Sequence, residues 1–116
     1  MAARNDKQVF YRKLAQVYKG MAHPVRVAVL DYLRDGEQCV CDIARHVGSE
    51  RSNVSRHLAV MVACGVLESR KEGLRVLYRI RAHCVAESLD CITRLIAQQA
   101  RDQVKLLGQV GLEERS

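Results

Sequence analysis

The stretch that decides the fold of this protein is DIARHVGSERSNVSRHLAVMVACGVLESRKEGLRVLYRIR, residues 42–81. Its first part predicts a short helix over 42–47 that stops at Gly48, and Ser49 is placed to N-cap a second helix over 50–64. Two runs rich in Val, Leu, Ile and Tyr follow around a glycine turn, which is typical of a β-hairpin. A helix-turn-helix followed at once by a hairpin is a winged helix, whose second helix usually enters the major groove of DNA.

Helical periodicity continues on both sides of this stretch. Residues 8–21 place apolar side chains on one face, and Pro24 suits the first turn of a further helix. From Ala82 onward the chain reads as one long amphipathic helix. We therefore predict a mainly α protein with a small β-hairpin, forming a single winged helix-turn-helix domain over 1–116 with its core at about 8–108.

Composition narrows the class of protein. The chain has 116 residues and a net charge of +6, and a small basic domain favours a polyanionic partner. It has no Trp and one Phe, so it is poorly equipped to stack the bases of a single strand. No stretch approaches the roughly 18 apolar residues of a membrane helix, and the N-terminus lacks an apolar signal core. We expect a cytoplasmic protein with no membrane partner, whose five cysteines are mostly reduced.

The helix over 50–64 has two unlike sides when its residues are placed about 100° apart. One side is apolar and consists of Val54, Leu58, Met61 and Val62. The opposite side and its flanks are small or polar. Arginine can pair with guanine, asparagine with adenine, and serine with several bases or a phosphate. The candidates for base contact are therefore Ser52, Asn53, Ser55 and Arg56.

The hairpin favours DNA binding over a merely solvated helix face. Arg70, Lys71 and Arg75 surround its turn, where a wing grips phosphates. His57 lies between the two sides of the preceding helix. For His57, a partly buried structural role explains the position at least as well as a base contact does.

Four motifs in order resemble one known family. HPVRVAVLDYL (23–33), CVCDIA (39–44), SNVSRHLAVMVACGVLESRKEG (52–73) and LYRI (77–80) resemble the ArsR/SmtB family of bacterial metal-responsive repressors, over about residues 8–100. The resemblance implies a winged-helix homodimer whose first and last helices form the dimer interface. It also implies binding to a palindromic DNA operator without the effector, and release when the effector binds.

Two apolar stripes independently call for a second subunit, because a chain of this length has too little core to cover both. The first stripe consists of Phe10, Leu14, Val17, Tyr18 and Met21. The second consists of Val85, Leu89, Ile92, Ile96, Val104 and Leu107.

The pair Cys39 and Cys41 is the candidate effector site. Thiolates select thiophilic ions over Mg or Ca, and in the family that the chain resembles this spacing marks sensors of arsenite, antimonite, cadmium and lead. Residues i and i+2 of one helix lie about 200° apart. The two sulfurs can therefore share an ion only if Cys39 lies outside the third helix and Cys41 caps it. The alternative is that both pack as small hydrophobes.

The match to the family's ligand sets is partial. The place of a third arsenite-type cysteine is Ala44, and residues 1–22 hold no cysteine for a cadmium/lead-type set. A third ligand can come from Cys64, Cys84 or Cys91, from the other subunit or from a small thiol. Two thiolates suit As(III) better than Cd(II) or Pb(II). Some members of the family carry a zinc-type site on the last helix. The corresponding positions here hold Ala82, Cys84, Leu95 and Gln98. These residues do not form that ligand set, so we expect no zinc site there.

The leading hypothesis is a repressor that binds operator DNA and is released from it when As(III) or Sb(III) binds the thiolates, with no organic cofactor. The alternatives are a Cd(II)/Pb(II) sensor, a thiol redox or persulfide sensor of the same fold, and a DNA-binding protein with no effector. Cys84 and Cys91 stand about 10 Å apart along one helix, so packing at an interface is the preferred role for them, and His83 is expected to be structural. An enzyme is disfavoured, because the sequence has no nucleophile–base set, phosphate loop or paired carboxylates in a recognisable frame.

Overall fold

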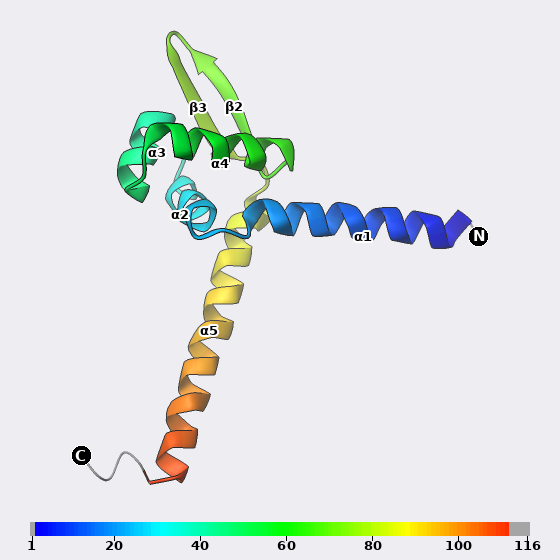
Figure 1. Ribbon diagram of the computed structural model, residues 1–116, viewed down its shortest axis with the longest axis vertical. Coiled ribbons are helices and arrows are strands. Elements are labelled where there is room, and N and C mark those ends of the chain that lie inside the picture. The colour runs from blue at the N-terminus through cyan, green and yellow to red at the C-terminus, as the bar shows by residue number, and fades with distance from the viewer. Residues whose placement is uncertain (1, 112–116) are drawn as a thin grey trace. The chain divides into compact units, whose positions relative to one another are not determined.

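The computed structural model describes residues 2–111, with side chains from Asn5 onward. Its elements follow the order of a winged helix (Figure 1): α1 Ala2–Met21, α2 Pro24–Leu33, β1 Gln38–Cys39, α3 Val40–Val47, α4 Arg51–Ala63, β2 Leu67–Glu72, β3 Arg75–Ile80 and α5 His83–Gln109. The predicted mainly helical winged helix-turn-helix is confirmed. The chain forms two compact units, the first ending at Ala86 and the second beginning at Glu87.

The helix-turn-helix pair supplies most of the core of the first unit. Gly48 ends α3 in the left-handed conformation, with φ 69°, and its N–H donates to the carbonyl of Ala44, which is the usual chemistry of a helix stop. The apolar side predicted for α4 is confirmed, because three of its four side chains are buried against α2 and α3: Val54, Leu58 and Met61. The opposite side of α4 is exposed, as the positions Ser52, Arg56, Ala59 and Ala63 show.

The wing is a three-stranded antiparallel sheet in the order β1-β3-β2, where the sequence predicted only a two-stranded hairpin. The added strand pairs Gln38 with Tyr78 and Cys39 with Leu77. Two residues are too few to show an alternating pattern, so this strand exists only through its non-local partners. In Figure 1, β2 and β3 continue past the helices as a two-stranded ribbon.

Two helix starts differ from the predicted ones. Helix α3 begins at Val40, so the residue that caps it is Cys39, and the prediction that Cys41 caps it is wrong. Cys39 does lie outside the helix, as predicted. The N-cap of α4 is Glu50, which makes no side-chain cap hydrogen bond, and not Ser49. The Ser49 hydroxyl instead accepts a hydrogen bond from Asn53 at 2.8 Å.

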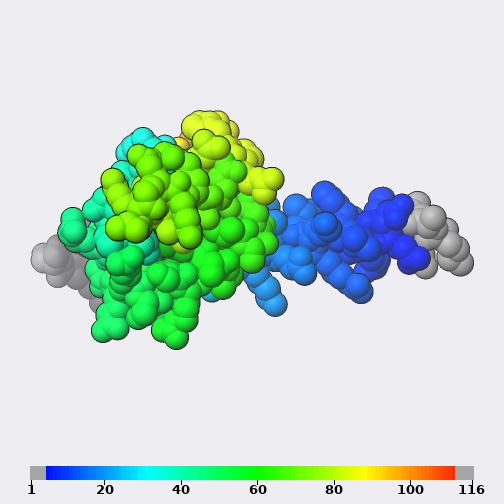
Figure 2. Space-filling model, turned by 90° about the horizontal axis from the view of Figure 1, so that it is seen from above, coloured from blue at the N-terminus to red at the C-terminus, as the bar shows by residue number. Residues whose placement is uncertain are grey.

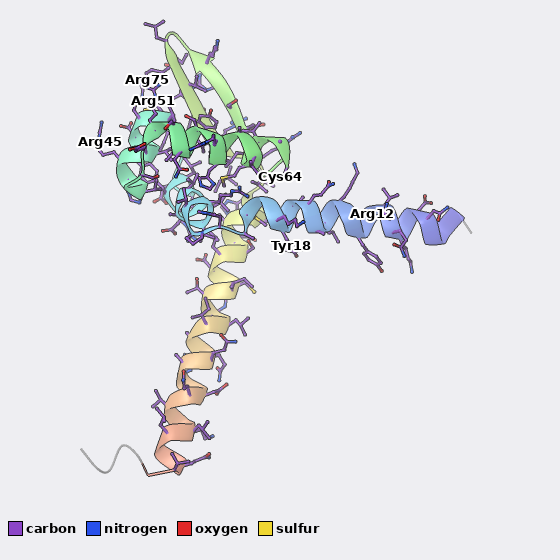
Figure 3. The ribbon with its side chains drawn as sticks, viewed as in Figure 1. Arg12, Tyr18, Arg45, Arg51, Cys64 and Arg75 are labelled. Atoms are coloured by element: carbon purple, nitrogen blue, oxygen red, sulfur yellow. The ribbon has the colours of Figure 1, made fainter. Side chains whose placement is uncertain are left out.

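Helix α1 begins at Ala2 rather than near residue 8, since no Gly or Pro interrupts the intervening residues. It contacts α2 and α4, and Gly20 near its end is buried. A Cβ at Gly20 would lie 2.2 Å from the sulfur of Cys64, so this glycine permits the close approach of α1 to α4. Figure 3 shows Cys64 at the end of α4 that faces α1.

Large apolar side chains remain exposed on both long helices. In Figure 2 much of α1 stands as a rod that the rest of the first unit does not cover. Its exposed apolar residues are Val9, Phe10, Tyr11, Leu14 and Tyr18. In the second unit, α5 exposes Ile92, Leu95, Ile96, Val104, Leu106 and Leu107. Within residues 2–111 no helix is both long and apolar enough to cross a lipid bilayer.

Candidate DNA-binding surface and cysteine site

The exposed face of α4 carries three of the four predicted base-contacting residues. Ser52, Ser55 and Arg56 are exposed, whereas Asn53 is half-buried and donates to Ser49. The first turn of α4 has no acidic residue, and it begins with Arg51. A positive side chain at a helix N-terminus adds to the positive end of the dipole. This end of α4 therefore attracts anions such as a phosphate.

Sequence reasoning missed two basic residues on this surface, Arg45 and Arg51. Arg45 projects from α3 and forms an ion pair with Asp42 at 3.4 Å. Figure 3 shows Arg45, Arg51 and Arg75 at the same end of the helical pair. Arg51 could have been found from the sequence, because it lies in the first turn of the predicted helix over 50–64. A basic residue there is electrostatically unfavourable unless an anion binds nearby.

On the wing, Arg70 is held by acids of the same chain. It donates to both carboxylate oxygens of Glu37, at 2.8 and 2.6 Å, and it forms an ion pair with Glu72 at 2.9 Å. The hydrogen bond with Glu37 is the main cause that raises the pKa of Arg70 and lowers the pKa of Glu37. Of the three predicted phosphate contacts, Arg70 is therefore already engaged, while Lys71 is exposed at the end of β2.

The third wing residue, Arg75, belongs to the surroundings of the cysteine site. Cys39 is 8% exposed, and its thiol donates to a carboxylate oxygen of Asp42 at 3.1 Å. A hydrogen bond from the Arg75 guanidinium to Cys39 is the main cause that raises the pKa of Arg75, and the charge of Asp42 adds to it. The Cys39 sulfur thus lies between an acid from α3 and a base from β3, whereas Cys41 is exposed.

Within the described part of the first unit, no third cysteine joins this pair. Among the described residues, no three His, Cys, Asp or Glu side chains are grouped as metal ligands. Cys64 lies against Gly20 and donates to the carbonyl of Met61 at 3.4 Å. Cys84 and Cys91 are exposed on α5, Cys84 in the first unit and Cys91 in the second. The pair can therefore supply two sulfurs, and a further ligand has to come from elsewhere.

Three links join the cysteine segment to the wing. The backbone of Cys39 pairs with Leu77 of β3, its side chain interacts with Arg75 of β3 strongly enough to raise the pKa of that arginine, and Glu37 holds Arg70 of β2. Helix α3 also packs on α4. Cys39 is therefore connected to the wing directly and to α4 through α3.

His57 has the partly buried structural role considered for it above. Its Nδ1 accepts a hydrogen bond from Nε of Arg26 at 3.0 Å, and its ring lies 4.3 Å from that of His23. Arg26 also donates to the carbonyl of Lys19 at 3.2 Å. These contacts tie α4 to α2 and to the end of α1. The hydrogen bond from Arg26 requires a neutral His57, because a protonated ring has no acceptor to offer Arg26.

Acidification is expected to weaken the fold through His57. Partial burial lowers the pKa of His57, and the charges of His23, Arg26 and Arg56 lower it further. As the pH falls below about 6.5, the unfolded histidine binds a proton that the folded one does not, so the free energy of unfolding falls. Urea unfolding between pH 7.5 and 5.5 measures this decline. His57→Gln, whose amide oxygen can still accept from Arg26, should show a shallower decline, and an unchanged slope would contradict the assignment.

Comparison with known proteins agrees with this fold. The family model described as "Bacterial regulatory protein, arsR family" matches residues 23–69. The transcriptional regulator Rv0081 of Mycobacterium tuberculosis is 31% identical over 103 residues, covering 88% of this chain and 90% of its own. Its crystal structure superposes with a TM-score of 0.74 at 32% identity, covering 82% of this chain and 96% of that one.

Two further similar proteins have names that state a DNA-binding or repressor role. The homodimeric winged helix-turn-helix DNA-binding domain of Mb0332 from Mycobacterium bovis has a TM-score of 0.71 and 31% identity, covering 84% of this chain and 89% of that one. The arsenical resistance operon repressor of Escherichia coli is 31% identical over 99 residues, covering 72% of this chain and 85% of its own. With an exposed reading helix, a wing beside it and relatives that match over most of its length, this chain belongs to the arsR family of bacterial DNA-binding transcriptional regulators, and it is not an enzyme.

Proposed function

We propose that this protein is a repressor that binds operator DNA as a homodimer and is released when As(III) or Sb(III) binds Cys39 and Cys41. The observation that carries the proposal is the position of Cys39. It stands at the junction of β1 and α3 and is hydrogen-bonded into the wing, while the neighbouring thiol of Cys41 is exposed. A repressor of arsenical resistance among the relatives supports the choice of ion.

The site suits a trivalent metalloid bound by two protein sulfurs. Arsenous acid loses two hydroxide groups, which leave as two waters with the two thiol protons, and two sulfur–arsenic bonds form. The third position keeps a hydroxide or takes a small external thiol. Cys39 must first give up its hydrogen bond to Asp42, a net cost of about 0.5–1.5 kcal/mol. Arg75 then lies beside the sulfur that has lost its proton.

Binding of the ion is coupled to the wing through Cys39. Turning this side chain toward Cys41 breaks its hydrogen bond to Asp42 and changes its contact with Arg75, at the residue that pairs with Leu77 of the wing. Arg75 is itself a proposed phosphate contact. A coupling of about 1–3 kcal/mol per site, equal to a change of about 5–150-fold in affinity, is enough for release.

DNA is proposed to lie against the exposed face of α4 and the wing. The whole chain is proposed to act as one DNA-binding domain. The proposed base contacts are Ser52, Asn53, Ser55 and Arg56, and the proposed phosphate contacts are Arg70, Lys71 and Arg75, joined by Arg51 at the N-terminus of α4. The exposed apolar stripes of α1 and α5 are proposed to form the homodimer interface, because they would otherwise face water.

Two substitutions separate base reading from phosphate contact. Arg56→Ala should weaken operator binding about tenfold or more and reduce the preference for operator over unrelated DNA, because a lost guanine contact costs about 1–3 kcal/mol. Lys71→Ala should weaken binding to both DNAs alike and lower the salt dependence by about one charge. Fluorescence anisotropy at several salt concentrations measures both. If the two variants behave alike, the assignment of α4 as the reading helix fails.

The inducer is tested on the operator complex of the unmodified chain. The complex is titrated with As(III), Sb(III), Cd(II), Pb(II), Zn(II) and a thiol oxidant, and anisotropy reports release. Release by As(III) and Sb(III) at the lowest concentrations supports the proposal. Release by Cd(II) or Pb(II) alone, or by the oxidant and by no ion, replaces it with one of the other sensor types.

A further inference from the structure

An open cavity of about 570 Å³ lies at the base of the wing, within the first unit. It is bounded by the end of α2 and the turn that follows, by β2 and β3, and by the first turn of α5. Its charged lining is mostly basic. Four lining residues are arginines and, among the described residues that line it, one is acidic, Glu37. The arginines are Arg34, Arg70, Arg79 and Arg81.

The contact between Glu37 and Arg70 indicates which chemistry this lining accepts. Both oxygens of the Glu37 carboxylate lie on the guanidinium fork, at 2.8 and 2.6 Å. A planar fork of this kind binds carboxylates and phosphates in the same geometry. Glu37 therefore occupies, from within the chain, the place that an external oxyanion fits.

Two of the other arginines of the cavity are held in position by acids that do not line it. Arg34 lies 3.3 Å from Asp31, and Arg79 pairs with Glu68. These pairs are partly exposed and individually weak. Arg81 is exposed and forms no ion pair within the described part of the chain. An anion with several charges can engage more than one guanidinium at once, which the single carboxylate of Glu37 does not do.

We propose that this cavity binds a small oxyanion with two or more negative charges, a polycarboxylate or a phosphate, which takes the fork of Arg70 from Glu37. The site goes beyond the arsenic response and does not depend on it. Displacement of Glu37 removes one of the three links between the cysteine segment and the wing. The cavity thus provides a second input to the same DNA-binding surface.

The test is calorimetric titration of the full chain with citrate and with pyrophosphate, without DNA or arsenic and at constant ionic strength set by chloride. Acetate serves as the singly charged comparison. Saturable binding of citrate or pyrophosphate, at least tenfold tighter than that of acetate, is expected. The stronger of the two ligands tells a carboxylate source from a phosphate source. Equal weak binding of all three anions would overturn the proposal.

Two variants should change the affinity in opposite directions. Arg81→Gln should weaken binding threefold or more, while Glu37→Gln should strengthen it severalfold, because it removes both a competitor for Arg70 and a negative charge. Arg12→Gln on the exposed part of α1 removes the same charge outside the cavity and should change the affinity less than twofold. Circular dichroism verifies that each variant is folded. Equal effects of Arg81→Gln and Arg12→Gln, or no gain from Glu37→Gln, would contradict the assignment.

Discussion

Replacing Cys39 and Cys41 together by serine is expected to abolish release of the operator by As(III). The unmodified protein should lose about 5–150-fold in operator affinity when the metalloid binds, the range that a coupling of about 1–3 kcal/mol produces. When As(III) is added, the double variant should lose less than about twofold in operator affinity. A serine hydroxyl is a poor ligand for a thiophilic ion. Anisotropy of a labelled operator, with and without As(III), measures both.

The matched control removes a cysteine elsewhere. Cys91→Ser on α5 leaves both sulfurs of the pair in place, and Cys91 is exposed in the single chain. This variant should keep the full response to As(III) if the third arsenic ligand comes from solvent. Operator affinity without As(III) should be the same in the double variant and in the unmodified chain, and the response of Cys91→Ser is measured relative to its own affinity without As(III). A response that survives the double substitution would remove Cys39 and Cys41 from the sensor.

Ile96→Glu should separate the proposed dimer and weaken operator binding by about two orders of magnitude or more. Ile96 is 59% exposed in the single chain, so the substitution leaves the core of the chain intact. In a dimer, however, it would bury a carboxylate without a partner, at a cost of several kcal/mol. Because a dimer engages two half-sites at once, a monomer loses the benefit of the linked second contact. Sedimentation analysis gives the oligomeric state, and anisotropy gives the affinity.

Lys105→Glu provides the control for this substitution on the same helix. Position 105 lies nine residues from 96, about 180° around the helix, and it is exposed. The same new side chain on the opposite face should leave the oligomeric state unchanged. Dissociation caused by both variants, or by neither, would place the dimer interface somewhere other than this stripe of α5.

The helices were predictable because their signals are local. Apolar residues at helical spacing placed the buried side of α4 at Val54, Leu58 and Met61, and the glycine after α3 marked its end. The capping residues were less predictable. Ser49 and Cys41 both had suitable neighbours in sequence, yet Glu50 and Cys39 hold the capping positions. A shift of one or two residues at a helix start costs little locally, so packing decides it.

The sequence by itself determined the order of elements, the two sides of the reading helix and the two apolar stripes, because each depends on residues a few positions apart. Only the tertiary structure decided what surrounds Cys39. Three contacts join segments more than thirty residues apart. They are the strand pairing of Cys39 with Leu77, the interaction of its side chain with Arg75, and the ion pair of Glu37 with Arg70. No periodic pattern encodes such contacts, since they arise when the chain folds back and opposite charges and unpaired backbone groups meet.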